Sequence, residues 1–173
     1  MKNIFLIIVI LSSFIANAQK CKYQRNEVDN FTKKTIIETK REIFTTSGMG
    51  LGFGTAYSLF KSDDNKFIRF YFSTTDKPFA IKEGDNIMIK FSDDDVMSLK
   101  FSKSDISNSS YISQIKTSTY SLDALISITE SDIRIFESKI ITDIRVYTTD
   151  GYIDGEVNAK RAKKFQSILK CIE

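Results

Sequence analysis

Residues 48–59 read "GMGLGFGTAYSL", and this stretch has two different faces. The even positions are all small: Gly48, Gly50, Gly52, Gly54, Ala56 and Ser58. The odd positions, apart from Thr55, are bulky: Met49, Leu51, Phe53, Tyr57 and Leu59. Because successive side chains of a strand point to opposite faces, the pattern predicts a strand with one bulky face and one nearly bare face.

The glycines do not form a nucleotide-binding loop. A G-x-G-x-x-G fingerprint would place its third glycine at Phe53 or Thr55, and no helical pattern follows. Glycine in a strand packs nothing and loses more backbone entropy than other residues, so the bare face indicates that something needs the space. We expect the C-terminal helix to dock there; a ligand or a partner strand is the alternative occupant. The candidate ligand or packing face is therefore Gly48, Gly50, Gly52 and Gly54.

Alternation continues along most of the chain and predicts further strands. A region rich in Ser, Asn and Thr, residues 102–118, is predicted to be a loop. The predicted strands are 67–73, a hairpin of 86–91 with 96–101, then 120–128, and a closing hairpin of 141–148 with 152–157.

Two helices interrupt this alternation. Thr129 and Asp132 have the spacing of a capping box, which predicts a short helix over 130–138. Asn158 is a typical N-cap for a C-terminal amphipathic helix. The apolar stripe of that helix consists of Ala162, Phe165, Ile168, Leu169 and Ile172.

These elements predict one α+β domain over residues 19–173. It is predominantly antiparallel β, with seven to nine strands in a curved sheet or small barrel, one short helix and the C-terminal helix. The length of about 150 residues is sufficient to bury a hydrophobic core without a metal.

Residues 1–18 have the features of a signal peptide. Lys2 precedes an apolar run over 4–11, and Ala16-Asn17-Ala18 fits a signal-peptidase site. Gln19 and Lys20 stand before Cys21 where a lipoprotein signal needs small residues. The sequence therefore predicts an exported protein, periplasmic or secreted, with no transmembrane segment in its mature chain.

The only two cysteines, Cys21 and Cys171, lie near the two ends of the mature chain. In an exported protein an even pair predicts a disulfide. A metal or redox role is disfavoured, because the two are far apart in sequence and the chain has no histidine.

The absence of histidine also excludes Ser-His-Asp and Cys-His sites. Ser-x-x-Lys occurs at Ser58/Lys61, Ser113/Lys116 and Ser167/Lys170, but without the other elements of serine–lysine enzymes. The acidic groups Asp93–Asp95 and Asp150, Asp154, Glu156 lack the spacing of a calcium-binding loop. We therefore expect no enzyme activity, no cofactor and no metal.

The charge pattern does not indicate nucleic acid. Removal of Lys2 with the signal peptide leaves a net charge of only +2. The basic run "KRAKK", residues 160–164, fits the solvated face of the C-terminal helix, or contact with an anionic lipid or an acidic protein.

Three segments carry a resemblance: "NEVDNFT" at 26–32, "DIRVYTTDGYIDGEV" at 143–157 and "FQSILKCI" at 165–172. With these segments the mature chain resembles small exported proteins of Bacteroidota-type bacteria. The resemblance implies an exported location and a similar topology, and it implies no activity.

The sequence thus predicts an exported, non-catalytic binding domain whose partner is an envelope or secreted protein. The alternative is a carrier that holds a small apolar ligand between the glycine-faced strand and the C-terminal helix.

Overall fold

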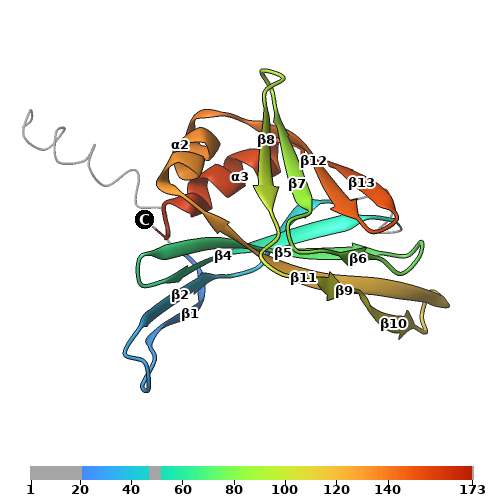
Figure 1. Ribbon diagram of the computed structural model, residues 1–173, viewed down its shortest axis with the longest axis horizontal. Coiled ribbons are helices and arrows are strands. Elements are labelled where there is room, and N and C mark those ends of the chain that lie inside the picture. The colour runs from blue at the N-terminus through green and yellow to red at the C-terminus, as the bar shows by residue number, and fades with distance from the viewer. Residues whose placement is uncertain (1–20, 47–51, 173) are drawn as a thin grey trace, which may run out of the picture.

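The computed structural model describes residues 21–46 and 52–172 (Figure 1). The predicted signal peptide, Gly48 and Gly50 lie outside the described residues. Within the described ranges the chain forms two main antiparallel sheets, a small two-stranded sheet and two helices. The predicted class, α+β with mostly antiparallel strands, is confirmed.

The first sheet has seven strands in the order β1-β2-β4-β5-β11-β10, with β3 beside β4. It curls but stays open, with β1 and β10 at its edges (Figure 1). Its strands are β1 (Tyr23–Val28), β2 (Thr35–Thr39), β3 (Glu42–Thr45), β4 (Gly54–Ser62), β5 (Asn65–Thr74), β10 (Asn108–Ile112) and β11 (Thr117–Ile128).

The second sheet has the order β13-β12-β7-β8 and lies with both helices on one side of the first sheet (Figure 1). Its strands are β7 (Asn86–Phe91), β8 (Val96–Lys100), β12 (Ile141–Thr148) and β13 (Gly151–Glu156). The helices are α2 (Glu130–Ser138) and α3 (Ala159–Leu169), and the small sheet pairs β6 (Ala80–Ile81) with β9 (Asp105–Ile106).

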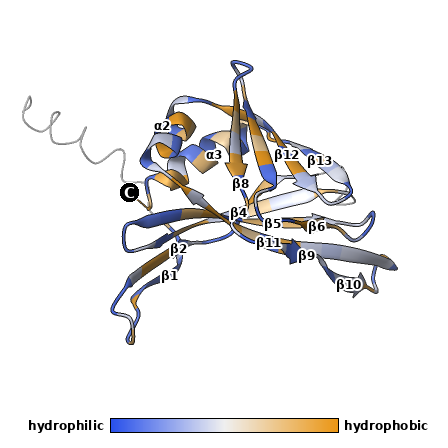
Figure 2. Cartoon of the chain, in the orientation of Figure 1, coloured by the Kyte–Doolittle hydropathy of each residue, from blue (hydrophilic) through white to orange (hydrophobic). Residues whose placement is uncertain are grey.

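The core lies between the first sheet and these covering elements. Figure 2 shows apolar residues distributed over the strands and helices that meet there. Phe165 of α3 is fully buried, and its ring centroid lies 5.0 Å from that of Tyr57 and 5.4 Å from that of Phe44. The ring of Phe136, on α2, lies 5.3 Å away on the helical side. Phe165 therefore joins both helices to the sheet.

Both predicted helices are confirmed, together with their N-caps, although α3 ends at Leu169 and Ile172, predicted in its apolar stripe, lies buried beyond the helix. The side chain of Thr129 accepts a hydrogen bond from the N–H of Asp132, and the Asp132 carboxylate accepts from the N–H of Thr129, which is the predicted capping box. Asn158 caps α3 by accepting from the N–H of Arg161 at 3.0 Å. Gln166 of α3 donates to the carbonyls of Phe136, Glu137 and Lys139, which lie at the end of α2.

The predicted disulfide between Cys21 and Cys171 is present. Their Cα atoms are 5.7 Å apart, and the bridge spans 150 positions of sequence. The hydroxyl of Tyr23 also donates to the carbonyl of Cys171 at 3.3 Å. The start of β1 is thereby held to the segment that follows α3.

The prediction of a loop over 102–118 is wrong. This region contains β9, β10 and the first residues of β11, and β10 pairs with residues 117–121. β10 is a polar edge strand exposed to solvent on nearly all of its residues. A strand with no buried face has no apolar alternation, which explains why the sequence pattern did not reveal it. The expected seven to nine strands become thirteen in the described residues, because β1, β2, β3, β6, β9 and β10 were not among the predicted strands.

The prediction for residues 48–59 is only partly right. β4 begins at Gly54, and Gly52 lies before it in a bend with φ of +98°. Within β4 the alternation holds, because Thr55, Tyr57 and Leu59 are buried on one face. The C-terminal helix docks on this bulky face, through Phe165 and Tyr57, and not on the glycine face as expected. The aromatic rings supply apolar surface to bury, and a row of small residues supplies very little.

Candidate functional site

The first sheet packs against α3 with its inner face, and its opposite, outer face carries a trough of about 690 Å³. Its floor is built from rows of residues paired across neighbouring strands. One row joins Gly54, Ser73 and Ser121, and the next joins Ala56, Tyr71 and Asp123. We call this surface the outer trough and define it by Arg41, Gly54, Ala56, Arg69, Tyr71 and Asp123, all of which line it.

A network of polar side chains extends from the floor of the outer trough into the sheet. Glu38 is only 2% exposed, and its Oε1 accepts from Arg69 Nη1 at 3.0 Å and from Ser58 Oγ at 3.1 Å. The hydroxyl of Ser58 also lies 3.3 Å from the hydroxyl of Tyr71. Arg69 and Tyr71 are thus fixed from below by a buried carboxylate and a buried serine.

Arg41, in the connection between β2 and β3, stacks on the ring of Tyr71. Its guanidinium carbon is 3.5 Å from the centroid of the Tyr71 ring, a cation–π contact. Its side chain is exposed, and it forms no ion pair with any residue that the structure describes. Stacking uses the face of a guanidinium and leaves its N–H edge available to a carboxylate or another acceptor.

The two described glycines of the candidate face have different roles. Gly52 adopts a positive φ that side-chain-bearing residues rarely adopt, and its N–H donates to Thr75 Oγ1 at 2.9 Å. Gly54 lies in regular strand, where an added Cβ would meet only Ser73 Oγ, at 3.4 Å. Gly54 therefore keeps the floor of the outer trough low, and Gly52 shapes the turn that enters β4.

None of the Ser-x-x-Lys pairs forms a catalytic arrangement in the described part of the chain. Ser58 and Lys61 stand three apart on β4, so their side chains point to opposite faces. Ser113 donates to Gln114, and Ser167 donates to the carbonyl of Lys164 at 2.6 Å. Each serine hydroxyl therefore has a partner other than the lysine of its pair.

The aspartates of the two acidic groups pair with neighbouring cations. Lys139 pairs with both Asp93 and Asp95, and Lys90 pairs with Asp94 at 2.8 Å. The hydrogen bond from Lys139 holds the pKa of the Asp93 carboxyl below its ordinary value. In the other group, Asp154 receives a bidentate contact from Arg145, at 2.7 and 2.8 Å, and Asp150 lies 3.6 Å from Lys77. Among the described residues no cluster has the composition of a metal site.

The basic run on α3 also has local partners. Lys164 pairs with Glu42 of β3, and Arg161 donates to Thr46 at 3.1 Å. These contacts attach α3 to β3 and the residue after it, which gives Arg161 and Lys164 a structural role.

Comparison with protein families, curated proteins and solved structures finds no match for this chain. Among the helices in the described ranges, none combines the length and the apolar character needed to cross a bilayer.

Gly54 was predicted from the sequence as part of a candidate face, whereas the charged and aromatic residues around it were not. Glu38, Arg41 and Tyr71 come from strands and connections whose pairing with β4 is set by tertiary structure. One signal was available: Arg69 and Tyr71 alternate with the buried Ile68, Phe70 and Phe72, and so had to share the outer face.

Proposed function

We propose that the protein is an exported, non-catalytic binding domain that holds a segment of a partner protein in the outer trough. The observation that carries the proposal is the platform of Arg41 on Tyr71, fixed by the buried Ser58–Glu38–Arg69 network. Arginine and tyrosine are the residue types that most often dominate the energetics of protein interfaces.

The stability of the fold does not explain this network. Burial of a carboxylate such as Glu38 costs solvation free energy, and pairing with an arginine typically only offsets that cost. An apolar pair at these positions would fill the same space. The presence of the charged Glu38 and Arg69 at the outer trough is better explained by recognition of polar groups of a partner.

The character of the surface favours a polypeptide over a small apolar ligand. The outer trough is open, its floor carries Arg41, Arg69 and Asp123, and its rim includes Ile43, which is 57% exposed. A mixture of fixed charges, one aromatic ring and peripheral apolar groups matches the composition of protein interfaces. The carrier alternative requires a space between the glycine face and the C-terminal helix, and α3 packs on the other face.

The test is site-specific photo-crosslinking in cells that make the protein. A photoreactive amino acid replaces Ala56, on the floor of the outer trough, and the control replaces Ser98, which is exposed on β8 of the second sheet. We expect residue 56 to capture a defined polypeptide and residue 98 to capture much less of it. Gly54→Val, which raises the floor beside Ser73, should reduce the yield from residue 56.

Equal labelling from residues 56 and 98, or no protein adduct at residue 56, would overturn the proposal. The free energy of unfolding of Gly54→Val provides the control for folding. Gly52→Val is unsuitable as a test variant, because the positive φ of Gly52 would strain any β-branched replacement.

A further inference from the structure

The hairpin of β1 and β2 ends in a tip, residues 28–33, that presents apolar side chains to solvent. Phe31 is 96% exposed and Val28 is 56% exposed. Transfer of a phenylalanine side chain from water into an apolar pocket favours binding on the order of 10- to 100-fold in an equilibrium constant. A fully exposed phenylalanine on an ordered turn is therefore a strong candidate for a contact residue.

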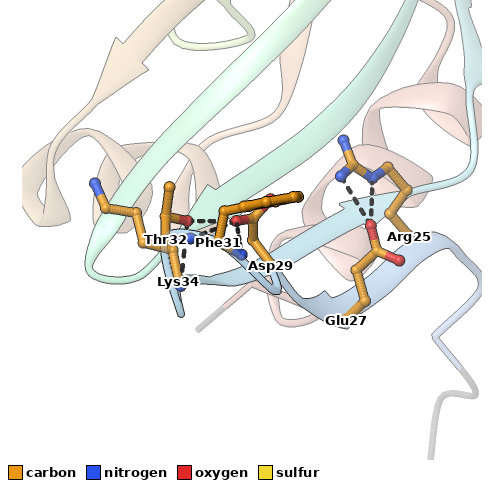
Figure 3. A network of polar contacts seen from close by, with 6 residues as sticks. All are labelled: Arg25, Glu27, Asp29, Phe31, Thr32 and Lys34. Atoms are coloured by element: carbon orange, nitrogen blue, oxygen red, sulfur yellow. Dashed lines mark hydrogen bonds and ion pairs between the residues drawn. The ribbon is translucent and has the colours of Figure 1, made fainter.

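A network of hydrogen bonds centred on Asp29 supports the backbone of this tip (Figure 3). Asp29 Oδ1 accepts from the N–H of Phe31 at 3.0 Å, from the N–H of Thr32 at 2.6 Å and from the Thr32 hydroxyl at 2.9 Å. Lys33 has a positive φ of 61°, and its N–H donates to the Asp29 carbonyl at 2.8 Å. A preorganised loop loses less conformational entropy on binding, so the turn is built to present Phe31.

The hairpin is anchored to the sheet that carries the outer trough. The N–H of Thr35 donates to Asp63 Oδ1 at 3.1 Å, and the N–H of Asp63 donates to the Thr35 carbonyl at 3.0 Å. Gln24 of β1 lines the outer trough itself. Figure 1 shows the hairpin turned away from both helices and the second sheet. A partner in the outer trough therefore lies next to this hairpin.

The charges around the tip favour a protein pocket over a membrane surface. Residues 25–34 contain three cationic and two anionic side chains, and Arg25 and Glu27 pair with each other at 2.8 Å. Recognition of anionic lipid typically requires a cluster of about four to eight basic residues. One aromatic ring with nearly balanced charges falls short of that requirement.

From this geometry we infer that Phe31 is the aromatic anchor of the interface and inserts into an apolar pocket of the same partner protein that occupies the outer trough. The inference rests on the proposed function and extends it, because it gives the partner a second recognition feature. Asp29 and Thr32 are positioning residues that hold the turn in place.

The experiment combines the photoreactive group at residue 56 with substitutions at the tip. Phe31→Ala should lower the yield of the adduct about tenfold or more, as loss of an aromatic anchor does, whereas Phe31→Tyr should retain most of it. Asp29→Ala should lower the yield by a smaller factor, and Asp64→Ala, an exposed acid in the next turn, should leave it unchanged. Phe31→Ala should also leave thermal unfolding unchanged, since the side chain is exposed.

A second crosslinker at residue 31 identifies what the tip contacts. The inference requires adducts to the same polypeptide that residue 56 captures. If residue 56 labels a partner but Phe31→Ala changes nothing, or if residue 31 labels only lipid or another protein, the role of Phe31 is overturned and the proposed function stands. If residue 56 labels no protein, both are overturned.

Discussion

The two faces of the first sheet are made by the same strands and have opposite chemistry. On the inner face, Tyr57, Phe70 and Phe72 are at most 1% exposed and pack in a continuous aromatic core with Phe165. On the outer face, the alternate positions carry small, polar or charged side chains, such as Ala56, Tyr71 and Arg69, and line the outer trough. Successive side chains of a strand point alternately to the inner and the outer face. A strand such as β5 therefore contributes residues both to the core and to the candidate site.

The difference shows where stability and recognition are located. Burial of apolar area on the inner face is the dominant favourable term for folding. The outer face buries the Glu38 carboxylate against Arg69, whose side chain is 30% exposed, and the net contribution of such a pair to stability is small. Substitutions on the two faces should therefore separate into those that unfold the protein and those that affect only binding.

The largest loss of stability is expected from Phe165→Ala, on the inner side. Removal of this ring leaves a cavity where both helices meet the sheet, and truncation of a buried phenylalanine typically costs about 3–5 kcal/mol. Denaturant unfolding followed by circular dichroism measures the change. The matched control is Phe31→Ala, which removes the same side chain from an exposed position and should change the free energy of unfolding by less than about 0.5 kcal/mol. Similar losses for both variants would contradict the assignment of the core.

The next effect is expected from loss of the Cys21–Cys171 disulfide, which supports both faces by joining the two ends of the domain. Loop-closure entropy predicts about 5 kcal/mol for a loop of 150 residues, and measured losses are usually about 2–5 kcal/mol. Denaturant unfolding of the oxidised protein and of the Cys21→Ala/Cys171→Ala variant measures the difference. A variant as stable as the oxidised protein would show that the bridge contributes no constraint.

A smaller effect is expected from the ion pair on the outer face. Arg69→Leu should cost about 2–3 kcal/mol, because it leaves the Glu38 carboxylate buried with only Ser58 as a partner. The double variant Glu38→Leu/Arg69→Leu should recover to within about 1 kcal/mol of the unsubstituted protein, since neither charge remains. Denaturant unfolding of all four proteins completes the double-mutant cycle. A double variant less stable than both single variants would show that the network is primarily a stabilising element.

The smallest effect concerns the pH dependence of the hairpin tip. Hydrogen bonds from Thr32, and then from the N–H of Phe31, hold the pKa of the Asp29 carboxyl below its ordinary value of 3.8. A lowered folded-state pKa means that the stabilisation of the turn is present above about pH 4 and is lost as the pH falls through the folded value. NMR titration of the Asp29 carboxyl measures this midpoint. Thr32→Val should raise it towards 3.8, and a midpoint at or above 3.8 in the unsubstituted protein would contradict the account.

The sequence predicted best those elements that bury one face. The bounds of α2 were predictable because Thr129 and Asp132 form a capping box with local geometry, and β7 and β12 were predictable from their alternating apolar residues. Pairing of the two cysteines followed from their even number together with the predicted export. The polar edge strand β10 has no buried face, so its sequence carried no period that could reveal it.

The candidate site could be predicted only in part. Alternation correctly separated Gly54 and Ala56 from the bulky residues of β4, but it could not show which face the C-terminal helix would cover. The polar network beneath Arg41 and Tyr71 also depends on the register in which the strands pair. Glu38 of β2, Ser58 of β4 and Arg69 of β5 are brought together by strand pairings between segments up to 31 residues apart. No local sequence pattern predicts contacts between residues that are this far apart in the sequence.

The most direct test of the central claim is the variant Arg41→Glu, measured for stability and binding together. Arg41 is exposed and touches only the Tyr71 ring in the contacts described above, so the free energy of unfolding should change by less than about 1 kcal/mol. We expect crosslinking from residue 56 to be lost nonetheless, because Arg41→Glu reverses the charge at this position of the outer trough. Crosslinking that persists at the unsubstituted level in a folded Arg41→Glu protein would contradict the claim that this face binds the partner.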